Sequence, residues 1–230
     1  MKLSPRLQAI ADYVPKGAIV ADIGTDHGYI PVYLAREEIS CKIIATDINE
    51  GPLQNAKSYI DKESYGEIIE TRLGNGLKCM LPNEVDTVII AGMGGILIAE
   101  ILENSKDITQ TIKNFILQPM VASEDLRRYL INNNYRILNE KLAKEGNKIY
   151  EVMLATHGMD KIENDIYYEI GKKLVENKDE HLKEFLKNKI RKTENILRKL
   201  KNNETIEGKQ RYESLKNKNE EYKKVLNDIC

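Results

Sequence analysis

The stretch 18–31 constrains the fold most, because an apolar run leads directly into a glycine-containing turn and then into a second apolar stretch. Residues 18–21 have the composition of a buried strand, and the apolar residues after the turn have helical spacing. We expect Gly24 to turn with a positive φ, and Gly28 to let a ligand or a strand come close. The pattern predicts strand, tight turn and helix. Asp22 would then end the strand at the sheet edge where open α/β proteins bind ligands.

A second acidic strand end follows at residues 42–49, a short β-rich run that closes on Asp47. Asp47 lies about 20 residues after Gly24, where nucleotide-binding α/β folds place an acid that accepts hydrogen bonds from ribose hydroxyls. We assign its neighbour Ile48 to the same cofactor-binding set. The alternatives are an ordinary strand-to-helix turn and a solvated loop aspartate. Two acidic strand ends at this distance favour the ribose interpretation.

The residues inside the glycine turn discriminate between cofactors. A dinucleotide fold calls for G-x-G-x-x-G, a glycine surface under a pyrophosphate. Here Thr25 and Asp26 stand between Gly24 and Gly28. A carboxylate repels a pyrophosphate, whereas it attracts a sulfonium or an α-amino group. The turn therefore fits S-adenosylmethionine better than NAD, and we assign Thr25 to the residues that would contact this cofactor.

Three later strand ends add candidate contacts. A third strand over 68–73 ends at Asn75 and Gly76, where the amide could hydrogen-bond an adenine edge or serve only the turn. The continuous apolar run 85–91 predicts a strand buried on both faces. It ends in a glycine-rich loop containing Gly92 and Met93, which we interpret as a floor for the cofactor or the reacting base.

The next strand, 114–117, ends at Gln118, whose following proline restricts it to an extended conformation and fixes the direction of its amide. Gln118 is therefore a catalytic candidate, with a plain turn as the alternative. Ser123 is predicted to cap the helix that follows. Runs at 135–143 and 148–156 predict a hairpin. Five parallel strands and a terminal hairpin form the methyltransferase arrangement, so we predict an α/β methyltransferase domain over residues 1–158.

Residues 159–230 differ in composition, with few glycines, many charges and apolar residues at helical spacing. We predict one long helix over 162–200 and a second over 212–229, packed as an antiparallel coiled-coil hairpin. The hairpin is either a dimerisation arm or an arm that grips RNA, and the small basic excess permits the second. The candidate RNA contacts are Arg6, Lys183, Lys187, Arg191, Lys192 and Arg198.

The composition bounds the remaining possibilities. The chain has 230 residues and a formal net charge of −1. Its three cysteines lack metal-ligand spacing, so we expect no metal and a reducing, cytoplasmic environment. Ser4 is predicted to cap a helix over residues 4–13, which is not a signal peptide. No apolar run is long enough to span a bilayer, and a monomer is favoured over an obligate oligomer.

Several motifs together resemble one family. They are Asp-Ile-Gly-Thr-Asp-His-Gly-Tyr-Ile-Pro at 22–31, Gly-Met-Gly-Gly at 92–95, Gln-Pro at 118–119, and the helical tail. They are similar to the bacterial tRNA (adenine-22-N1)-methyltransferase family, TrmK, over essentially the whole chain. The resemblance implies a Rossmann-like class I methyltransferase with a mostly parallel seven-stranded sheet, S-adenosylmethionine as donor and tRNA as substrate. Asn75 stands where the family favours aspartate.

The implied reaction assigns roles to three neighbouring residues. N1 of adenine is unprotonated near neutral pH, so it can attack a methyl group without a base. Asp26 would stabilise the positive charge that moves onto the base or contact its amino group, although it could hold only the cofactor. His27 and Tyr29 would stack on or hydrogen-bond the adenine, or merely cover the cofactor. A methyltransferase for another substrate and a non-catalytic cofactor-binding module are the alternative functions.

Overall fold

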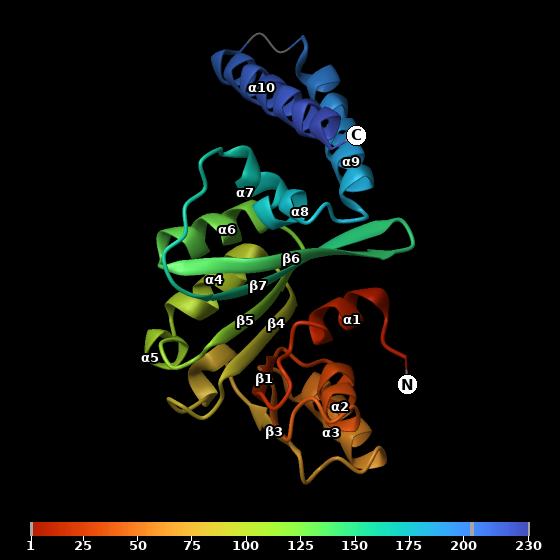
Figure 1. Ribbon diagram of the computed structural model, residues 1–230, viewed down its shortest axis with the longest axis vertical. Helices are drawn as coiled ribbons and strands as arrows, with labels where there is room; N and C mark the ends of the chain where they lie inside the picture. The colour runs from red at the N-terminus through yellow and green to blue at the C-terminus, as the bar shows by residue number, and fades with distance from the viewer. Residues whose placement is uncertain (1, 203–204, 230) are drawn as a thin grey trace. The chain divides into compact units, whose positions relative to one another are not determined.

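A seven-stranded sheet organises residues 19–157 of the computed structural model, which describes residues 2–202 and 205–229 (Figure 1). Its strand order is β3-β2-β1-β4-β5-β7-β6. The pairings from β3 to β5 are parallel, whereas β7 runs antiparallel to both β5 and β6. This confirms the predicted sheet and terminal hairpin. The strands are β1 (Ile19–Ile23), β2 (Lys42–Asp47), β3 (Ile69–Leu73), β4 (Thr87–Met93), β5 (Asn114–Pro119), β6 (Tyr135–Glu145) and β7 (Lys148–His157).

Helices cover both faces of this sheet, because alternate side chains of its buried strands face opposite sides. Ala21 and Ile23 of β1 join one apolar cluster with residues of α4, α5 and α6, while Val20 joins another with residues of α1, α2 and α3. The helical elements are α1 (Pro5–Ala11), α2 (Tyr29–Arg36), α3 (Glu50–Lys62), the 3₁₀ turn η1 (Gly76–Cys79), α4 (Gly95–Glu103), α5 (Lys106–Thr109) and α6 (Ser123–Asn132).

Of the two predicted helix caps, one is confirmed and one is wrong. Ser4 caps α1 as predicted, and its side chain accepts a hydrogen bond from the Leu7 amide. The predicted cap at Ser123 is wrong: Ala122, at φ 57, is the N-cap of α6, and Ser123 is the first helical residue. The Ser123 hydroxyl instead donates to Glu151 on β7 at 2.8 Å. Ser123 therefore bonds to a residue that is distant in the sequence instead of capping its own helix.

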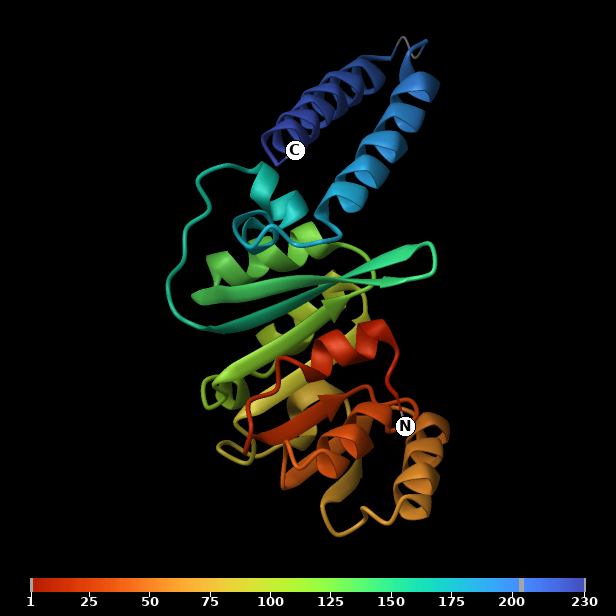
Figure 2. The same ribbon diagram turned by 45° about the vertical axis from the view of Figure 1, so that its right-hand side comes forward.

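The chain divides into two compact units, Met1–Lys161 and Ile162–Cys230. The second unit contains α7 (Ile166–Ile170), α8 (Lys172–Glu176), α9 (Leu182–Leu200) and α10 (Ile206–Asp228). The single helix predicted over 162–200 is wrong, because Gly171 at φ 78 separates α7 from α8 and a further break precedes α9. The helices α9 and α10 form the predicted antiparallel hairpin (Figure 2).

None of the helices in the described part of the chain is long and apolar enough to cross a membrane.

Candidate active site

A cavity of about 540 Å³ lies at the carboxyl edge of the sheet, beside the ends of β1 and β4. It has the volume of a typical small-molecule site. Residues from the β1–α2 turn, the β4 end and the amino-terminal segment surround it. They are Ser4, Arg6, Leu7, Asp22, Gly24, Thr25, Asp26, His27, Gly28, Tyr29, Ile30, Ala91, Gly92 and Met120.

Asp22 supplies a buried carboxylate to this cavity. Its side chain is withdrawn from water, and this desolvation raises its pKa to about 6. A hydrogen bond with Thr25 acts in the opposite direction, and the charge of Asp47 adds to the rise. The two acidic strand ends therefore lie close enough to influence each other, as predicted. A pair of this kind suits a ligand that brings positive charge or hydroxyl donors.

Backbone contacts hold the β1–α2 turn against β2. The amides of Gly24 and Thr25 both donate to the Thr46 carbonyl at 2.8 Å. Gly24 has φ 80, and a Cβ built on it would lie 2.3 Å from Cε of Met93. Gly28 has φ 68, and its added Cβ would lie 3.3 Å from the Ala56 carbonyl oxygen. Gly24 thus has the positive φ predicted for it, and Met93 lies against it. The close neighbour of Gly28 is helix α3, at Ala56, rather than the predicted ligand or strand.

Three exposed side chains of the same turn form one wall of the cavity. Oδ2 of Asp26 lies 3.2 Å from Nε2 of His27. The His27 ring stacks on Tyr29 with a centroid separation of 5.2 Å, and Tyr29 meets Tyr59 edge to face. The wall offers a carboxylate beside two aromatic faces, which can stack on a planar ring and stabilise positive charge on it.

Gln118 does not line the cavity but connects two groups that do. Its side chain is completely buried. Its Oε1 accepts hydrogen bonds from Nη1 of Arg6 at 2.8 Å and from the amide of Gly92 at 3.2 Å. Its Nε2 donates to the Pro119 carbonyl at 2.9 Å. The amide does have a fixed direction, as predicted, and the contacts it makes are those of a positioning residue.

Arg6 lies in the cavity wall although the sequence indicated only an RNA contact. Besides its bond to Gln118, its guanidinium lies 5.5 Å from the centre of the Tyr150 ring. Its backbone amide donates to Glu145 at 2.8 Å. Sequence reasoning missed the cavity contacts of Ser4, Leu7, Ile30, Ala91 and Met120. The predicted helix at residues 4–13 was the only local signal for the first two.

The remaining predicted contacts lie on the neighbouring strand ends outside this cavity. Asp47 accepts a hydrogen bond from the Asn49 amide at 2.7 Å, and its carbonyl accepts one from Gly74. Ile48 and Asn75 lie just after the ends of β2 and β3, and the Ile48 side chain is exposed. Gly76, at φ 58, packs closely against Ile101 of α4. Their positions suit a ligand that extends from Asp22 toward β3.

Within residues 2–202 and 205–229, no cluster of three or more histidine, cysteine, aspartate or glutamate side chains could hold a metal ion.

Known proteins share this architecture. Residues 3–153 match the family model of a methyltransferase domain. The tRNA (adenine(22)-N(1))-methyltransferase of Bacillus subtilis is 40% identical over 158 residues, which cover 69% of this chain and 66% of that protein, just under two thirds of its length.

Two solved structures match over the whole length of the chain. The crystal structure of the B. subtilis M1A22 tRNA methyltransferase TrmK superposes with a TM-score of 0.89 and 34% identity, covering 98% of this chain and 99% of that one. TrmK of M. capricolum, in complex with the cofactor product S-adenosyl-homocysteine, superposes with a TM-score of 0.85 and 30% identity, covering 100% of both chains.

Proposed function

Because the chain belongs to the TrmK family of tRNA (adenine-22-N1)-methyltransferases, we propose that its cavity transfers a methyl group from S-adenosylmethionine to N1 of adenine 22 in tRNA. Its fold is that of a Rossmann-like class I methyltransferase. The observation that carries the proposal is the acidic pair Asp22 and Asp47 beside a glycine turn. This membership favours tRNA over the alternative substrates and over a non-catalytic module.

The residues at the sheet edge fit this cofactor. Buried Asp22 is the carboxylate that a cationic amino end would stabilise, and Gly24 keeps the turn free of a side chain. Asp47 would accept hydrogen bonds from the ribose hydroxyls. Ile48 would cover the adenine, and Asn75 would reach its edge. Thr25, Gly28, Gly76, Gly92 and Met93 would complete the set.

When bound, S-adenosylmethionine supplies an electrophilic methyl group on a positively charged sulfur, which the lone pair of adenine N1 can attack. The chain must align the base, exclude water and stabilise charge as it moves onto the ring. We assign alignment to the stacked pair His27 and Tyr29, and charge stabilisation to Asp26. Gln118 contributes by holding Arg6 and Gly92 in place.

The Asp26→Asn variant should methylate tRNA about tenfold more slowly at saturating cofactor. The side chain is 66% exposed, so solvent screening limits the contribution of its charge to the rate. Nucleoside mass spectrometry of unmodified tRNA, after incubation with enzyme and donor, measures 1-methyladenosine. Asp107→Asn on α5 is the matched control and should retain the full rate. A comparable loss of cofactor affinity in Asp26→Asn would assign Asp26 to the cofactor instead.

Affinity for S-adenosylhomocysteine should rise about tenfold from pH 5 to pH 7. Burial raises the pKa of Asp22 to about 6 in the free protein, and a cationic or hydroxyl-bearing ligand favours the ionised carboxylate. Below pH 6 the Asp22 carboxyl must lose its proton before the ligand binds, which lowers the affinity. Above pH 6 the carboxyl is already ionised and this cost is absent. Isothermal titration at pH 5, 6 and 7 gives the dependence. The Asp22→Asn variant should bind more weakly and lose the pH dependence, and a retained slope would exclude Asp22 as its origin.

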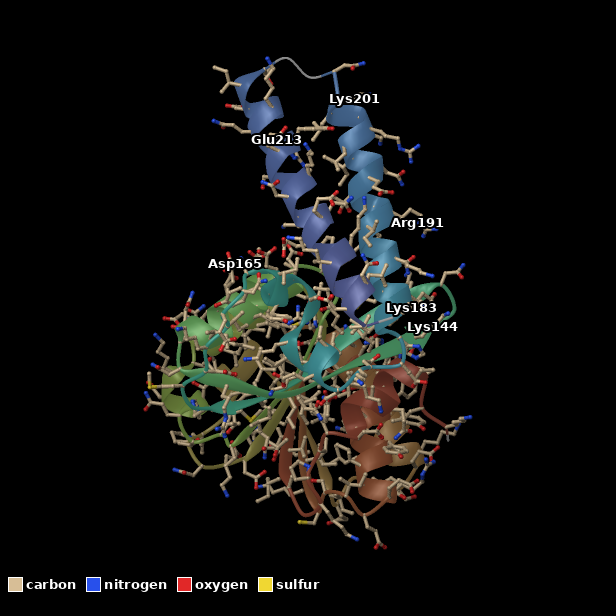
Figure 3. All side chains as sticks on the ribbon, turned by 45° about the horizontal axis from the view of Figure 1, so that its top comes forward. Lys144, Asp165, Lys183, Arg191, Lys201 and Glu213 are labelled. Carbon is tan, nitrogen blue, oxygen red and sulfur yellow. The ribbon has the colours of Figure 1, made fainter. Side chains whose placement is uncertain are left out.

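We also propose that α9 holds the RNA. Exposed or half-exposed cations recur along it at Lys183, Lys187, Arg191, Lys192 and Arg198. In the described ranges 2–202 and 205–229, no ion pair joins any of the five to an acid. Figure 3 shows Arg191 on the side of α9 turned away from α10. On α10, by contrast, Lys223 and Lys224 pair with glutamates.

Replacing Lys187 and Arg191 together with glutamine should weaken tRNA binding about tenfold at physiological salt and reduce its salt dependence, because two phosphate contacts are lost. Filter binding at two salt concentrations measures both effects. Lys216→Gln with Lys224→Gln on α10 is the matched control. Unchanged tRNA affinity, with altered oligomeric mass, would instead favour the dimerisation arm.

Since tRNA is cytoplasmic and one copy of the chain carries all the proposed cofactor and RNA contacts, we propose that the protein is a cytoplasmic monomer.

A further inference from the structure

Four large apolar side chains lie exposed at the carboxyl edge of the sheet, on two segments that follow the loop after β4 and the end of β5. Ile96 and Leu97 lie in the first turn of α4, and Met120 and Val121 follow β5. Each is between 45% and 67% exposed. Isolated exposed apolar residues are ordinary, but a contiguous group at a sheet edge that binds ligands indicates a binding surface.

Backbone hydrogen bonds bring the two loops together. The Met120 amide donates to the Met93 carbonyl at 2.8 Å, and the Gly95 amide donates to the Val121 carbonyl at 2.9 Å. A Cβ on Gly94 would lie 3.7 Å from Cγ2 of Val121. One on Gly95 would lie 2.1 Å from the Ala122 carbonyl oxygen, so the loops are packed backbone to backbone. We call the surface of Ile96, Leu97, Met120 and Val121 the apolar ledge.

The ledge lies outside the core, and one of its residues lines the cavity. Ile98 and Leu126, further along the same segments, are completely buried and fill the core. Met120, in contrast, lines the cavity together with Gly92. A substrate that contacts Met120 in the cavity would therefore lie beside the rest of the ledge. The cavity edge is polar at Asp26 and aromatic at His27 and Tyr29, so the ledge adds a purely aliphatic surface.

We propose that the apolar ledge packs against the nucleobases that flank the target adenine in tRNA and holds that adenine out of the stack. The inference rests on the proposed function. A base must leave the stack before its N1 can reach a buried methyl donor. Leucine, isoleucine and methionine side chains can insert between base steps in this way, and unpaired bases stack on apolar surfaces.

The test is a kinetic comparison of ledge and control variants. Leu97→Ser with Val121→Ser should raise KM for tRNA about tenfold, because the stacking surface is lost. Neither the affinity for S-adenosylhomocysteine nor the melting temperature should change. Leu81→Ser, at a residue 68% exposed between η1 and β4, is the matched control and should behave as the unaltered chain. An unchanged KM for tRNA in the double variant would overturn the inference while leaving methylation intact.

A second substrate tests the contact with the flanking base directly. Removing the base next to the target adenine should raise KM for the unaltered enzyme, and the double variant should then show no further loss. Additive losses would overturn the inference. So would a loss of cofactor affinity, or a dimer in the unaltered chain that the double variant dissociates. Absence of any tRNA methylation by the unaltered enzyme would overturn the proposed function as well.

Discussion

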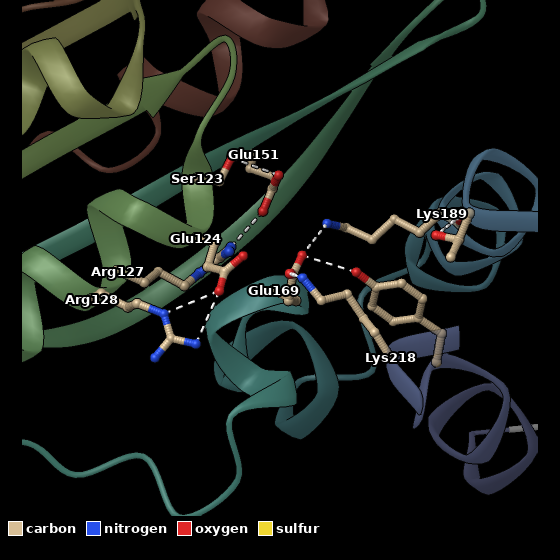
Figure 4. Close-up of polar contacts among 10 residues, drawn as sticks. Ser123, Glu124, Arg127, Arg128, Glu151, Glu169, Lys189 and Lys218 are labelled. Carbon is tan, nitrogen blue, oxygen red and sulfur yellow. Dashed lines mark hydrogen bonds and ion pairs between the residues drawn. The ribbon is translucent and has the colours of Figure 1, made fainter. Parts of the chain in front are cut away.

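Replacing Arg127 with leucine should lower the free energy of unfolding by about 3–5 kcal/mol. Arg127 on α6 is completely buried, and its guanidinium bonds Glu140 on β6 at 2.7 Å. It also bonds Glu151 on β7 at 2.6 Å (Figure 4). Burial acts to lower the pKa of Arg127, but the two carboxylates more than offset it and the net direction is upward. The variant would leave Glu140 buried without its cation, and that uncompensated charge is the source of the loss.

Arg128, the next residue, is the matched control for this prediction. It pairs with Glu124 one turn earlier on the exposed side of α6, and half-exposed helix pairs contribute only about 0.3–0.5 kcal/mol. Urea unfolding of the two leucine variants should therefore give clearly separated midpoints. Equal midpoints would mean that the ion pairs of Arg127 contribute no more than a surface pair. Because Glu151 also holds Ser123, we expect Arg127→Leu to loosen the start of α6 as well.

Replacing Asp47 with alanine should weaken binding of S-adenosylhomocysteine about a hundredfold. The proposed ribose contact consists of two hydrogen bonds to a charged acceptor, each with a contribution of about 1.5–3 kcal/mol. Losing both, with partial replacement by water, corresponds to roughly 2.7 kcal/mol in binding. Isothermal titration calorimetry with the purified variant measures the change.

Asp61→Ala supplies the control for Asp47. Asp61 is an exposed acid on the same strand–helix segment, at the far end of α3, whereas Asp47 is partly buried. Its removal should leave the affinity unchanged. The Asp47 variant should keep its melting temperature to within a few degrees, since its side chain accepts a local hydrogen bond from the Asn49 amide rather than a core contact. An affinity close to that of the unaltered protein would place the ribose elsewhere on the sheet edge.

The parts of the fold that the sequence predicts are those fixed by local pattern. Apolar runs ending in acids or glycines indicate the strands, because buried parallel strands require continuous apolar composition. The positive φ at Gly24 follows from the same reasoning, since a tight turn there tolerates few other residues. The antiparallel hairpin of the sheet follows from two strand-like runs on either side of a glycine turn.

The parts that local pattern misses depend on distant partners. Apolar spacing continues through Gly171, so the sequence predicts one helix over 162–200 although the backbone breaks there. The contacts of Glu169 explain the break. Lys189, Lys218 and Tyr222 all bond to Glu169 and hold α7 against the hairpin (Figure 4). These partners are 20 to 53 residues away in the sequence, so a short sequence window does not include them. The link from Gln118 to Arg6 likewise joins residues 112 positions apart.

That long-range link also bears on the order of biosynthesis. Arg6 leaves the ribosome well before Gln118, Glu145 and Tyr150, the residues that it contacts. The nascent chain can pair β1 with β2 early, but the contacts that hold Arg6 can form only after β5, β6 and β7 have emerged. A truncated translation product would then carry both acids but lack the contacts that position Arg6.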